Sequence, residues 1–307
     1  MNDLSIIIVS YNTRDLLRAC LHSAFDGLER SGLRGVVWVV DNASADGSAD
    51  MAREQFPQAR VIANAENRGF AAANNQAIAQ SDARHVMLLN SDAEVRGDAL
   101  GEQVRALDER PKAGAVGARL VYADGSFQHS AFRFAGFAQI LLDFFPLHHR
   151  LLDSGLNGRY SRRLYEGKEP FPVDHPLGAA LMARAETIRQ VGPLDEGFFM
   201  YCEEVDWCWR MHKAGWQVLC VPTAEVMHHG AGTTRKFREE MFVALWRSRF
   251  RLYEKHQGAR YTAWVRRWVR MLLRLDGARI RRRLARGEIA EDEARALLSG
   301  YARVAAL

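Results

Sequence analysis

Two short polar segments each follow an apolar run that is typical of a buried strand. Asp41 ends the run Gly35–Val40, and Asn90-Ser91-Asp92 follows the run His85–Leu89. The carboxylate of Asp41 could accept a hydrogen bond from a nucleobase. Asp92 could hold Mg²⁺, which proteins bind through one or two carboxylates together with substrate phosphates. Turns and helix caps use the same residue types, so a structural role is the alternative for both segments.

A third polar segment, Asn67-Arg68-Gly69, precedes an alanine-rich stretch that we expect to be helical. Backbone N–H groups at a helix start, together with the guanidinium of Arg68, could bind phosphates. The segment has a single glycine, and the chain contains neither of the glycine-rich phosphate-binding motifs G-x-G-x-x-G and G-x-x-x-x-G-K-[ST]. The motif evidence for phosphate binding is therefore limited to this one segment.

Three carboxylates cluster at the start of a predicted helix over residues 203–214. Glu203, Glu204 and Asp206 lie among aromatic residues, and a carboxylate beside an apolar wall can act as a general base. The helix dipole also favours acidic residues at this end, which is the structural alternative. Asp206 and Arg210 are four residues apart and can pair, which would make Asp206 a weak base. Glu204 is turned about 100° from Glu203, toward a less charged side of the helix. We therefore predict Glu204 as the base, with Asp206 as second candidate and Glu203 as a structural or acceptor-binding group.

The apolar runs predict how these segments are positioned. Strands are predicted at residues 4–10, 35–40, 60–63, 85–89, 176–183 and 217–221, with helices to about residue 28, at 48–56, 71–80 and 203–214, and from about 239 to the end. Strands that alternate with helices form a mostly parallel sheet, so the fold class is α/β. Such sheets bind ligands at the carboxyl ends of their strands. His228-His229 follow the last predicted strand and a loop, where a histidine is more often structural than a metal ligand.

Composition sets the broad class of the protein. The 307 residues, 48% hydrophobic and 26% charged, form one large or two ordinary globular domains. No run of about 18 apolar residues is present, so no membrane-spanning helix is expected. The N-terminal Met1-Asn2-Asp3-Leu4 lacks the cationic region of a signal peptide. The four cysteines form no Cys-x-x-Cys pair, so neither a disulfide framework nor a zinc knuckle is expected. This cysteine usage favours the reducing environment of the cytoplasm.

Positive charge is concentrated in one segment. Residues 247–286 hold 14 Lys and Arg against two acidic residues, whereas the first 246 residues are mildly acidic. This argues against a general nucleic-acid binder and leaves DNA or RNA binding by the tail as a minor alternative. Within the segment, apolar residues recur at helical spacing with arginines on other faces: Trp264, Trp268, Met271, Leu272 and Leu275 with Arg266, Arg267, Arg270 and Arg274. This stripe either meets an anionic membrane surface or packs against protein, including a second subunit.

Taken together, these segments resemble glycosyltransferase family 2, the inverting enzymes with a GT-A fold, and most of all its rhamnosyltransferase-like and galactofuranosyltransferase-like bacterial branch. The segments that carry the resemblance occur in the family's order between about residues 4 and 235: Ser5–Asn12, Val39–Ser44, Asn67–Asn75, Leu88–Asp92, Gly178-Ala179, Phe198–Arg210 and Val226–His228. Asn90 stands where many members have the first Asp of an Asp-x-Asp motif, and Asn74 where many have an Arg. Both departures are usual in this branch.

The resemblance implies a role for each motif. Asp41, with Tyr11 beside it, reads the donor base; Asp92 and His228 hold Mg²⁺ or Mn²⁺ on the donor diphosphate; and Glu204 is the catalytic base. The full expected site comprises donor-binding Tyr11, Asp41, Asn67, Arg68, Gly69, Asn90, Ser91 and Asp92; Gly178, Ala179 and Glu203 on the acceptor or sugar side; catalytic Glu204 and Asp206; and metal-binding Asp92 and His228.

The resemblance implies an inverting, metal-dependent hexosyltransferase. Its donor is expected to be dTDP-rhamnose, and its acceptor a lipid-linked or cell-envelope glycan such as one on polyprenyl diphosphate. A UDP- or GDP-sugar donor, or a catalytically silent scaffold at a membrane, are the alternatives. We expect a catalytic domain over residues 1–238, with a donor half to about 118 and an acceptor half after it, and a basic helical region over 239–307. A cytoplasmic protein is expected, with a peripheral position on the inner face of the cytoplasmic membrane and homo-oligomerisation both left open.

Overall fold

The computed structural model describes residues 2–144, 154–230 and 238–307. It divides the chain into two compact units. The first comprises residues 1–134, 159–199 and 203–232, and the second comprises residues 135–158, 200–202 and 233–307. The second unit thus includes two short segments from before the predicted helical region as well as that region itself.

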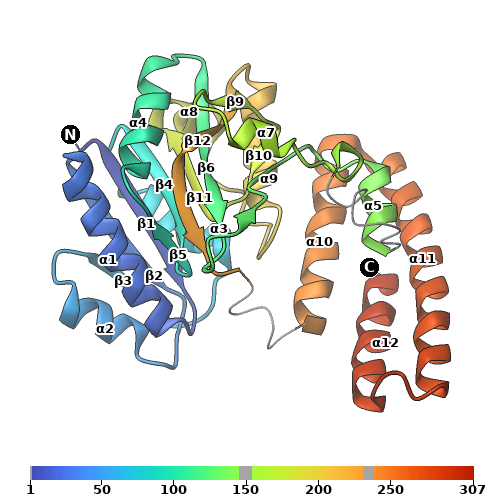
Figure 1. The fold of residues 1–307 in the computed structure, drawn as a ribbon. Coiled ribbons are helices and arrows are strands. Elements are labelled where there is room, and N and C mark those ends of the chain that lie inside the picture. The colour runs from blue at the N-terminus through green and yellow to red at the C-terminus, as the bar shows by residue number, and fades with distance from the viewer. Residues whose placement is uncertain (1, 145–153, 231–237) are drawn as a thin grey trace. The chain divides into compact units, whose positions relative to one another are not determined.

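A ten-stranded mixed sheet forms the centre of the first unit (Figure 1). The order along its main path is β3-β2-β1-β4-β11-β6-β12-β5, with β7 paired to β6 and β9 to β12, while β8 and β10 form a separate two-stranded sheet. The strands are β1 (Leu4–Ser10), β2 (Gly35–Asp41), β3 (Arg60–Ala63), β4 (His85–Asn90), β5 (Ala93–Val95), β6 (Ala113–Val121), β7 (Phe127–Gln128), β8 (Ala131–Phe132), β9 (Phe171–Pro172), β10 (His175–Pro176), β11 (Ala180–Arg184) and β12 (Gln217–His228).

The directions of the strands bring the polar segments to one edge. β1 pairs in parallel with β2 and β4, and β12 pairs in parallel with β6. β11 lies between β4 and β6 and runs antiparallel to both. The carboxyl ends of β2, β4 and β12 therefore share an edge with the turn that precedes β11. This predicted α/β, mostly parallel architecture is confirmed.

Helices cover both faces of the sheet, each with its apolar side inward. On one face, α1 (Arg14–Ser31), α2 (Ser48–Gln55) and α4 (Ala99–Glu109) pack against alternate strand residues such as Ile6 and Ile8. On the other face, α3 (Phe70–Ile78), α8 (Ala185–Val191) and α9 (Glu203–Lys213) pack against Ile7 and Leu88. Because successive strand side chains point to opposite faces, a continuous apolar run supplies both layers. A short helix, α7 (Arg162–Tyr165), completes the unit.

Two predicted strand boundaries were wrong. The strand expected from residue 176 begins at Ala180, because Gly178 and Ala179 form a turn and Pro176 belongs to β10. The strand expected to end at residue 221 continues to His228 as β12, so His228 closes a strand instead of following a loop. The ladder with β6 shifts register between Val221 and Glu225, around a proline that has no N–H to donate.

The second unit is helical. It contains α5 (Phe137–Phe144), a 3₁₀ turn (Gly155–Asn157), α10 (Arg238–Gln257), α11 (Ala259–Ala285) and α12 (Glu291–Ala306). Its core joins these helices through large side chains, among them Ile140, Trp246, Tyr253, Val269 and Val304. Within the described residues, no helix is both long enough and apolar enough to cross a bilayer.

The apolar stripe predicted on α11 is divided between core and solvent. Leu272 is buried, but Trp264, Met271 and Leu275 are exposed. The buried face of the helix is instead lined by Val265, Val269, Leu272, Leu273 and Ile280. The sequence contains two apolar rows on this helix, and the prediction merged parts of both.

Candidate functional site

Asp41 lies at the carboxyl end of β2 and is almost fully buried. Its Oδ2 accepts a hydrogen bond from the backbone N–H of Ser44 at 3.0 Å, while its Oδ1 is buried without a partner among the described residues. Buried polar atoms are nearly always hydrogen-bonded, so an unpaired carboxylate oxygen here needs an explanation. An acceptor held open for a ligand N–H supplies one. Tyr11, predicted beside it, is 39% exposed at the end of β1.

Asn42 organises the loop that follows β3. Its Nδ2 donates to Asn67 Oδ1 and to the carbonyl of Gly69, and its Oδ1 accepts from Asn64 and from the backbone N–H of Arg68. The N–H of Gly69 donates to Asn67 Oδ1. The N–H groups of Arg68 and Gly69 are therefore engaged within the loop, whereas the side chain of Arg68 is exposed.

Gly69 is required where this loop meets Phe199. The residue has a φ of +82°, and a Cβ built on it would lie 2.4 Å from the carbonyl oxygen of Phe199. The same carbonyl accepts a hydrogen bond from the N–H of Phe70 at 2.8 Å. The N-terminus of α3 is thus used for an internal contact.

Asp92 and His228 form the second polar centre, in the turn between β4 and β5 and at the end of β12. His228 Nε2 lies 3.3 Å from Asp92 Oδ1 and 3.5 Å from Asn90 Nδ2, and all three side chains come to the same edge of the sheet. The backbone supports the turn, since the N–H of His229 donates to the carbonyl of Asp92. Ser91 has a local role here: its hydroxyl accepts from Thr13, which links the ends of β1 and β4.

Gln128, which the sequence did not single out, orients His228. The Nδ1–H of His228 donates to Gln128 Oε1 at 3.2 Å. This bond orients the ring so that Nε2 faces the carboxylate of Asp92.

The Asp92–His228 pair fits a divalent cation only in part. Imidazole nitrogen and carboxylate oxygen are both suitable ligands for Mn²⁺, and carboxylates for Mg²⁺. Among the described residues, however, no cluster of three or more His, Cys, Asp or Glu side chains could hold a metal. Further ligands would have to come from substrate phosphates and water, as is usual for Mg²⁺ bound with nucleotides.

The N-terminal turn of α9 carries three carboxylates, of which Glu203 and Glu204 lie side by side in the chain. Glu203 is 6% exposed, and its Oε2 has no partner in the described structure. Burial raises the pKa of Glu203 well above its usual range, and the charge of Glu204 raises it further. Burial also raises the pKa of Glu204, and backbone N–H groups, including that of Gly178, offset part of the rise. Glu203 is therefore the neutral member of the pair when Glu204 is ionised.

Gly178 brings the turn before β11 against Glu204. A Cβ built on this glycine would lie 3.5 Å from Cβ and Cγ of Glu204, so the two residues are in direct contact. The next residue, Ala179, accepts a hydrogen bond from the N–H of Asn90 at 3.0 Å. Gly178-Ala179 therefore connects the Glu204 carboxylate with the end of β4, two residues from Asp92.

In the described structure, Asp206, unlike Glu203 and Glu204, pairs with an arginine, as the sequence predicted. Arg210 Nε donates to Asp206 Oδ2 at 2.8 Å, and Asp206 is fully buried. The guanidinium also donates to the backbone carbonyls of Val191, Gly192 and Pro193. The predicted Asp206–Arg210 pair is confirmed, and it ties α9 to the end of α8.

Backbone strain marks both sides of the site. Within the described residues, four residues other than glycine have positive φ angles: Asn12 (54°), Ala43 (65°), Tyr201 (69°) and Cys202 (68°). The first two follow β1 and β2, and the last two immediately precede Glu203. Residues in this left-handed region are uncommon and concentrate at functional sites.

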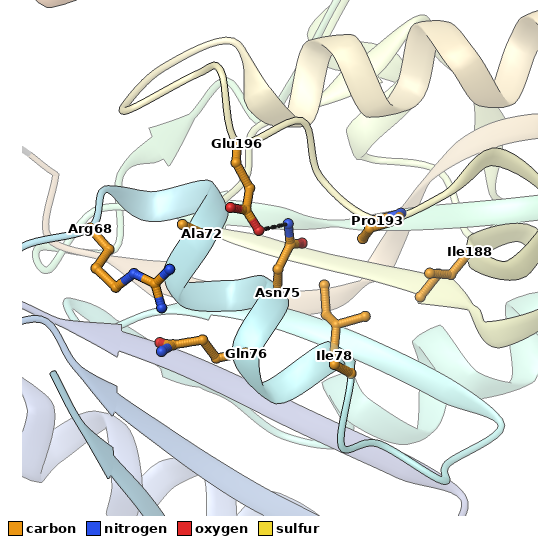
Figure 2. Close-up of a pocket in the computed structure, with 9 residues that line it drawn as sticks. Arg68, Ala72, Asn75, Gln76, Ile78, Ile188, Pro193 and Glu196 are labelled. Carbon is orange, nitrogen blue, oxygen red and sulfur yellow. Dashed lines mark hydrogen bonds between the residues drawn. The ribbon is translucent and has the colours of Figure 1, made fainter.

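A separate cavity of about 440 Å³ lies beside α3. Figure 2 shows Arg68 at its rim, with Asn75 and Glu196 joined by a hydrogen bond across it. Neither Asp41, Asp92, His228 nor Glu204 lines this cavity. The structure therefore places Arg68 beside this hollow and does not bring it to the Asp92–His228 pair.

The sheet, with carboxylates gathered at the carboxyl ends of its strands, has the GT-A type of glycosyltransferase fold. The model of the family described as glycosyl transferase family 2 matches residues 5–171, more than half of the chain. The chain belongs to this family.

Two relatives illustrate the match along the sequence. An N-acetylglucosaminyl-diphospho-decaprenol L-rhamnosyltransferase of Mycobacterium tuberculosis is 30% identical over 288 residues, which cover 88% of this chain and 89% of the relative. The low-salt glycan biosynthesis hexosyltransferase Agl10 of Haloferax volcanii is 25% identical over 259 residues, which cover 81% of this chain and 75% of the relative.

Solved structures agree on the fold. The mannosyltransferase PcManGT from Pyrobaculum calidifontis, solved with GDP-Man and Mn²⁺, matches with a TM-score of 0.60 at 15% identity, over 99% of this chain and 87% of that one. GalNAc-T7, solved with UDP, GalNAc and Mn²⁺, matches with a TM-score of 0.53 at 14% identity, over 74% of this chain and 44% of that one. The chain therefore spans less than half of GalNAc-T7, and both likenesses concern the fold alone.

Proposed function

We propose that this family 2 enzyme transfers rhamnose from dTDP-rhamnose, with inversion, to N-acetylglucosamine on a polyprenyl diphosphate. The Mycobacterium tuberculosis relative is named for a transfer of this kind, and the match covers nearly nine-tenths of both chains. The resemblance implies that Asn90 and Asn74, which depart from the pattern of many family members, are usual in the rhamnosyltransferase-like branch.

One observation supports this function above the others. Two carboxylates in different surroundings lie at one edge of the sheet: Asp92 beside the imidazole of His228, and Glu204, whose pKa is raised by burial, at the start of α9. They are connected through Gly178-Ala179, which contacts Glu204 on one side and Asn90 on the other. Sugar transfer needs these two functions on opposite sides of one anomeric carbon.

Each group then has a defined task. The free Oδ1 of Asp41 accepts a hydrogen bond from an N–H of the donor base. Asp92 and His228 would hold a divalent cation together with the donor diphosphate, and the cation would supply positive charge that stabilises the departing nucleoside diphosphate. Glu204 takes the proton of the acceptor hydroxyl. The hydroxyl oxygen bonds to the anomeric carbon as the bond from that carbon to the diphosphate breaks, which inverts the configuration.

A donor panel tests this function. Purified protein would be supplied with N-acetylglucosamine linked to a short polyprenyl diphosphate and, in turn, with dTDP-rhamnose, UDP-sugars and GDP-sugars, with and without Mn²⁺. We expect dTDP-rhamnose to give product and Mn²⁺ to increase the rate. If only a UDP- or GDP-sugar gives product, that sugar and not dTDP-rhamnose is the donor. If no donor is transferred or hydrolysed, the result favours a catalytically silent scaffold.

A further inference from the structure

One face of α11 exposes apolar side chains that are not buried in the core of the second unit. Trp264, Met271 and Leu275 are 42%, 41% and 51% exposed. At 100° per residue they fall within about 40° of one another, so they form a single row along the helix. This exposed row lies on the side of α11 away from Val269 and Leu273, which are buried in the core.

Aromatic packing supports Trp264 at the start of this row. Phe137 of α5 contacts Trp264 and Trp268, with ring centroids 4.5 and 5.2 Å apart. Trp264 and Trp268 also contact each other edge to face. Their outer edges are therefore presented to solvent by a supported surface, which limits the conformational entropy lost when that surface binds.

A second row, of arginines, runs beside the apolar one. Arg267, Arg274 and Arg281 are spaced seven residues apart, which places them on one line about 60–100° from the row of Trp264. All three are exposed, and within the described residues Arg267 and Arg274 form no ion pair. Arg267, Arg270 and Arg274 line a hollow of about 620 Å³ together with Trp264 and Met271. The single acidic residue of α11, Asp276, is engaged by Tyr301 and Arg279.

This combination indicates the chemistry of the partner. Arginines without an ion-pair partner favour a surface that carries phosphates. Transfer of the exposed Met271 and Leu275 side chains from water into an apolar medium is also favourable. A second copy of the chain is disfavoured, because a two-fold contact through this face would oppose arginine rows of the same charge. An anionic lipid bilayer offers both phosphates and an apolar layer beneath them.

We propose that α11 docks on the surface of an anionic bilayer, with Trp264, Met271 and Leu275 entering the headgroup–acyl boundary and Arg267 and Arg274 contacting lipid phosphates. The helix lies in the plane of the interface and does not cross it. Such docking would bring the enzyme to the surface that holds a polyprenyl-linked acceptor.

Vesicle co-sedimentation of the full-length protein tests this docking. We expect binding to vesicles rich in phosphatidylglycerol that weakens as salt is added, and little binding to vesicles of phosphatidylcholine alone. The variant Arg267→Gln/Arg274→Gln should bind about 25-fold more weakly at low salt, from the usual worth of two basic residues near an anionic surface. Met271→Gln/Leu275→Gln should weaken binding to the anionic vesicles as well.

Matched variants control for charge and apolar surface. Arg53→Gln/Arg295→Gln removes two exposed arginines elsewhere, and Leu297→Gln removes an exposed leucine of α12. Both should bind as the unchanged protein does. Equal loss in test and control variants, or binding without dependence on lipid charge, would overturn the proposal. So would a dimer that the α11 variants dissociate, or RNA binding with no vesicle binding. Because no donor or acceptor is present, failure here would leave the proposed sugar transfer untouched.

Discussion

The Asp92 side and the Glu204 side of the site use the same chemical group in opposite surroundings. Asp92 sits beside His228 and Asn90 in a turn that hydrogen bonds hold in place. Glu203 and Glu204 sit in an apolar turn of α9 and, within the described residues, form no ion pair. Under the proposed function, the fold would hold a charged ligand with one carboxylate and move a proton with the other.

Asp206 sharpens the comparison because it lies on the same helix as Glu204. Its carboxylate is bound by Arg210, which also fastens three backbone carbonyls. A paired carboxylate is a weak base, whereas a desolvated one is a stronger base. The proposal thus assigns a structural duty to Asp206 and a catalytic one to Glu204, two positions away.

The largest effect is expected on the Asp92 side. Asp92→Asn removes the charge that would hold a cation and the donor diphosphate, so turnover should fall by about 10³-fold, the worth of several kcal/mol. The fold should persist, because Asp92 lies in a turn between β4 and β5. Steady-state rates over a Mn²⁺ titration, with the melting temperature of each variant, check this. Asp50→Asn, on exposed α2, is the control. Full activity of Asp92→Asn in a chelator would show that this site uses no metal.

On the other side, Glu204→Gln should lower turnover by roughly 10²–10⁴-fold, the usual contribution of a general base. Donor affinity should stay nearly unchanged, because the base acts on the acceptor. Since burial raises the pKa of Glu204, the acidic limb of the activity profile of the unchanged enzyme should lie above the usual glutamic acid value of about 4.3 and be lost in the variant.

Asp206→Asn is the contrasting variant for this experiment. It should lower the free energy of unfolding, by about 3–5 kcal/mol, because it leaves Arg210 without its buried partner. If Asp206→Asn folds well but is inactive while Glu204→Gln turns over normally, the two assignments must be exchanged.

A smaller effect should follow from Gln128→Leu. Loss of its bond to Nδ1 frees the tautomer and orientation of His228, and such second partners are worth about 10–100-fold in metal affinity or activity. Isothermal titration with Mn²⁺ and a nucleoside diphosphate measures the metal affinity directly. The control variant Gln128→Glu keeps a hydrogen-bond acceptor and should retain most of the affinity. Unchanged affinity in Gln128→Leu would remove Gln128 from the site.

The smallest effect concerns stability against pH at Glu203. Because burial raises the pKa of Glu203 in the folded state, the folded protein holds a proton that the unfolded chain has lost. Its contribution to stability is present below the usual glutamic acid pKa of about 4.3 and falls, by up to about 1.4 kcal/mol per pH unit, until the raised pKa is reached. Glu203→Gln should remove this decline in chemical denaturation at a series of pH values. Parallel pH curves for the two proteins would contradict the buried, neutral state of Glu203.

The sequence could predict what depends on a chain's own pattern. The apolar runs before Asp41 and Asn90 identified β2 and β4, and a parallel sheet then placed both polar segments at one edge. Spacing alone identified the Asp206–Arg210 pair. The family resemblance supplied Glu204, Asp92 and His228, whose roles stay predictions.

What the sequence could not show depends on contacts between distant segments. Nothing near Gln128 indicates that β7 brings it to His228, 100 residues later. The continuation of β12 past Pro222 depends on the shifted ladder with β6. On α11, helical spacing could not distinguish the row that packs into the core from the row that remains exposed, because both rows are apolar.

The central claim is a single displacement in which Glu204 and the donor diphosphate act on opposite faces of the anomeric carbon. The most direct measurement is the anomeric configuration of the first product, determined by NMR at short reaction times with the unchanged enzyme. We predict a configuration opposite to that of the sugar in the donor, with no product from Glu204→Gln in the same interval. A product that retains the donor configuration would contradict the single displacement and the role of Glu204 as its base.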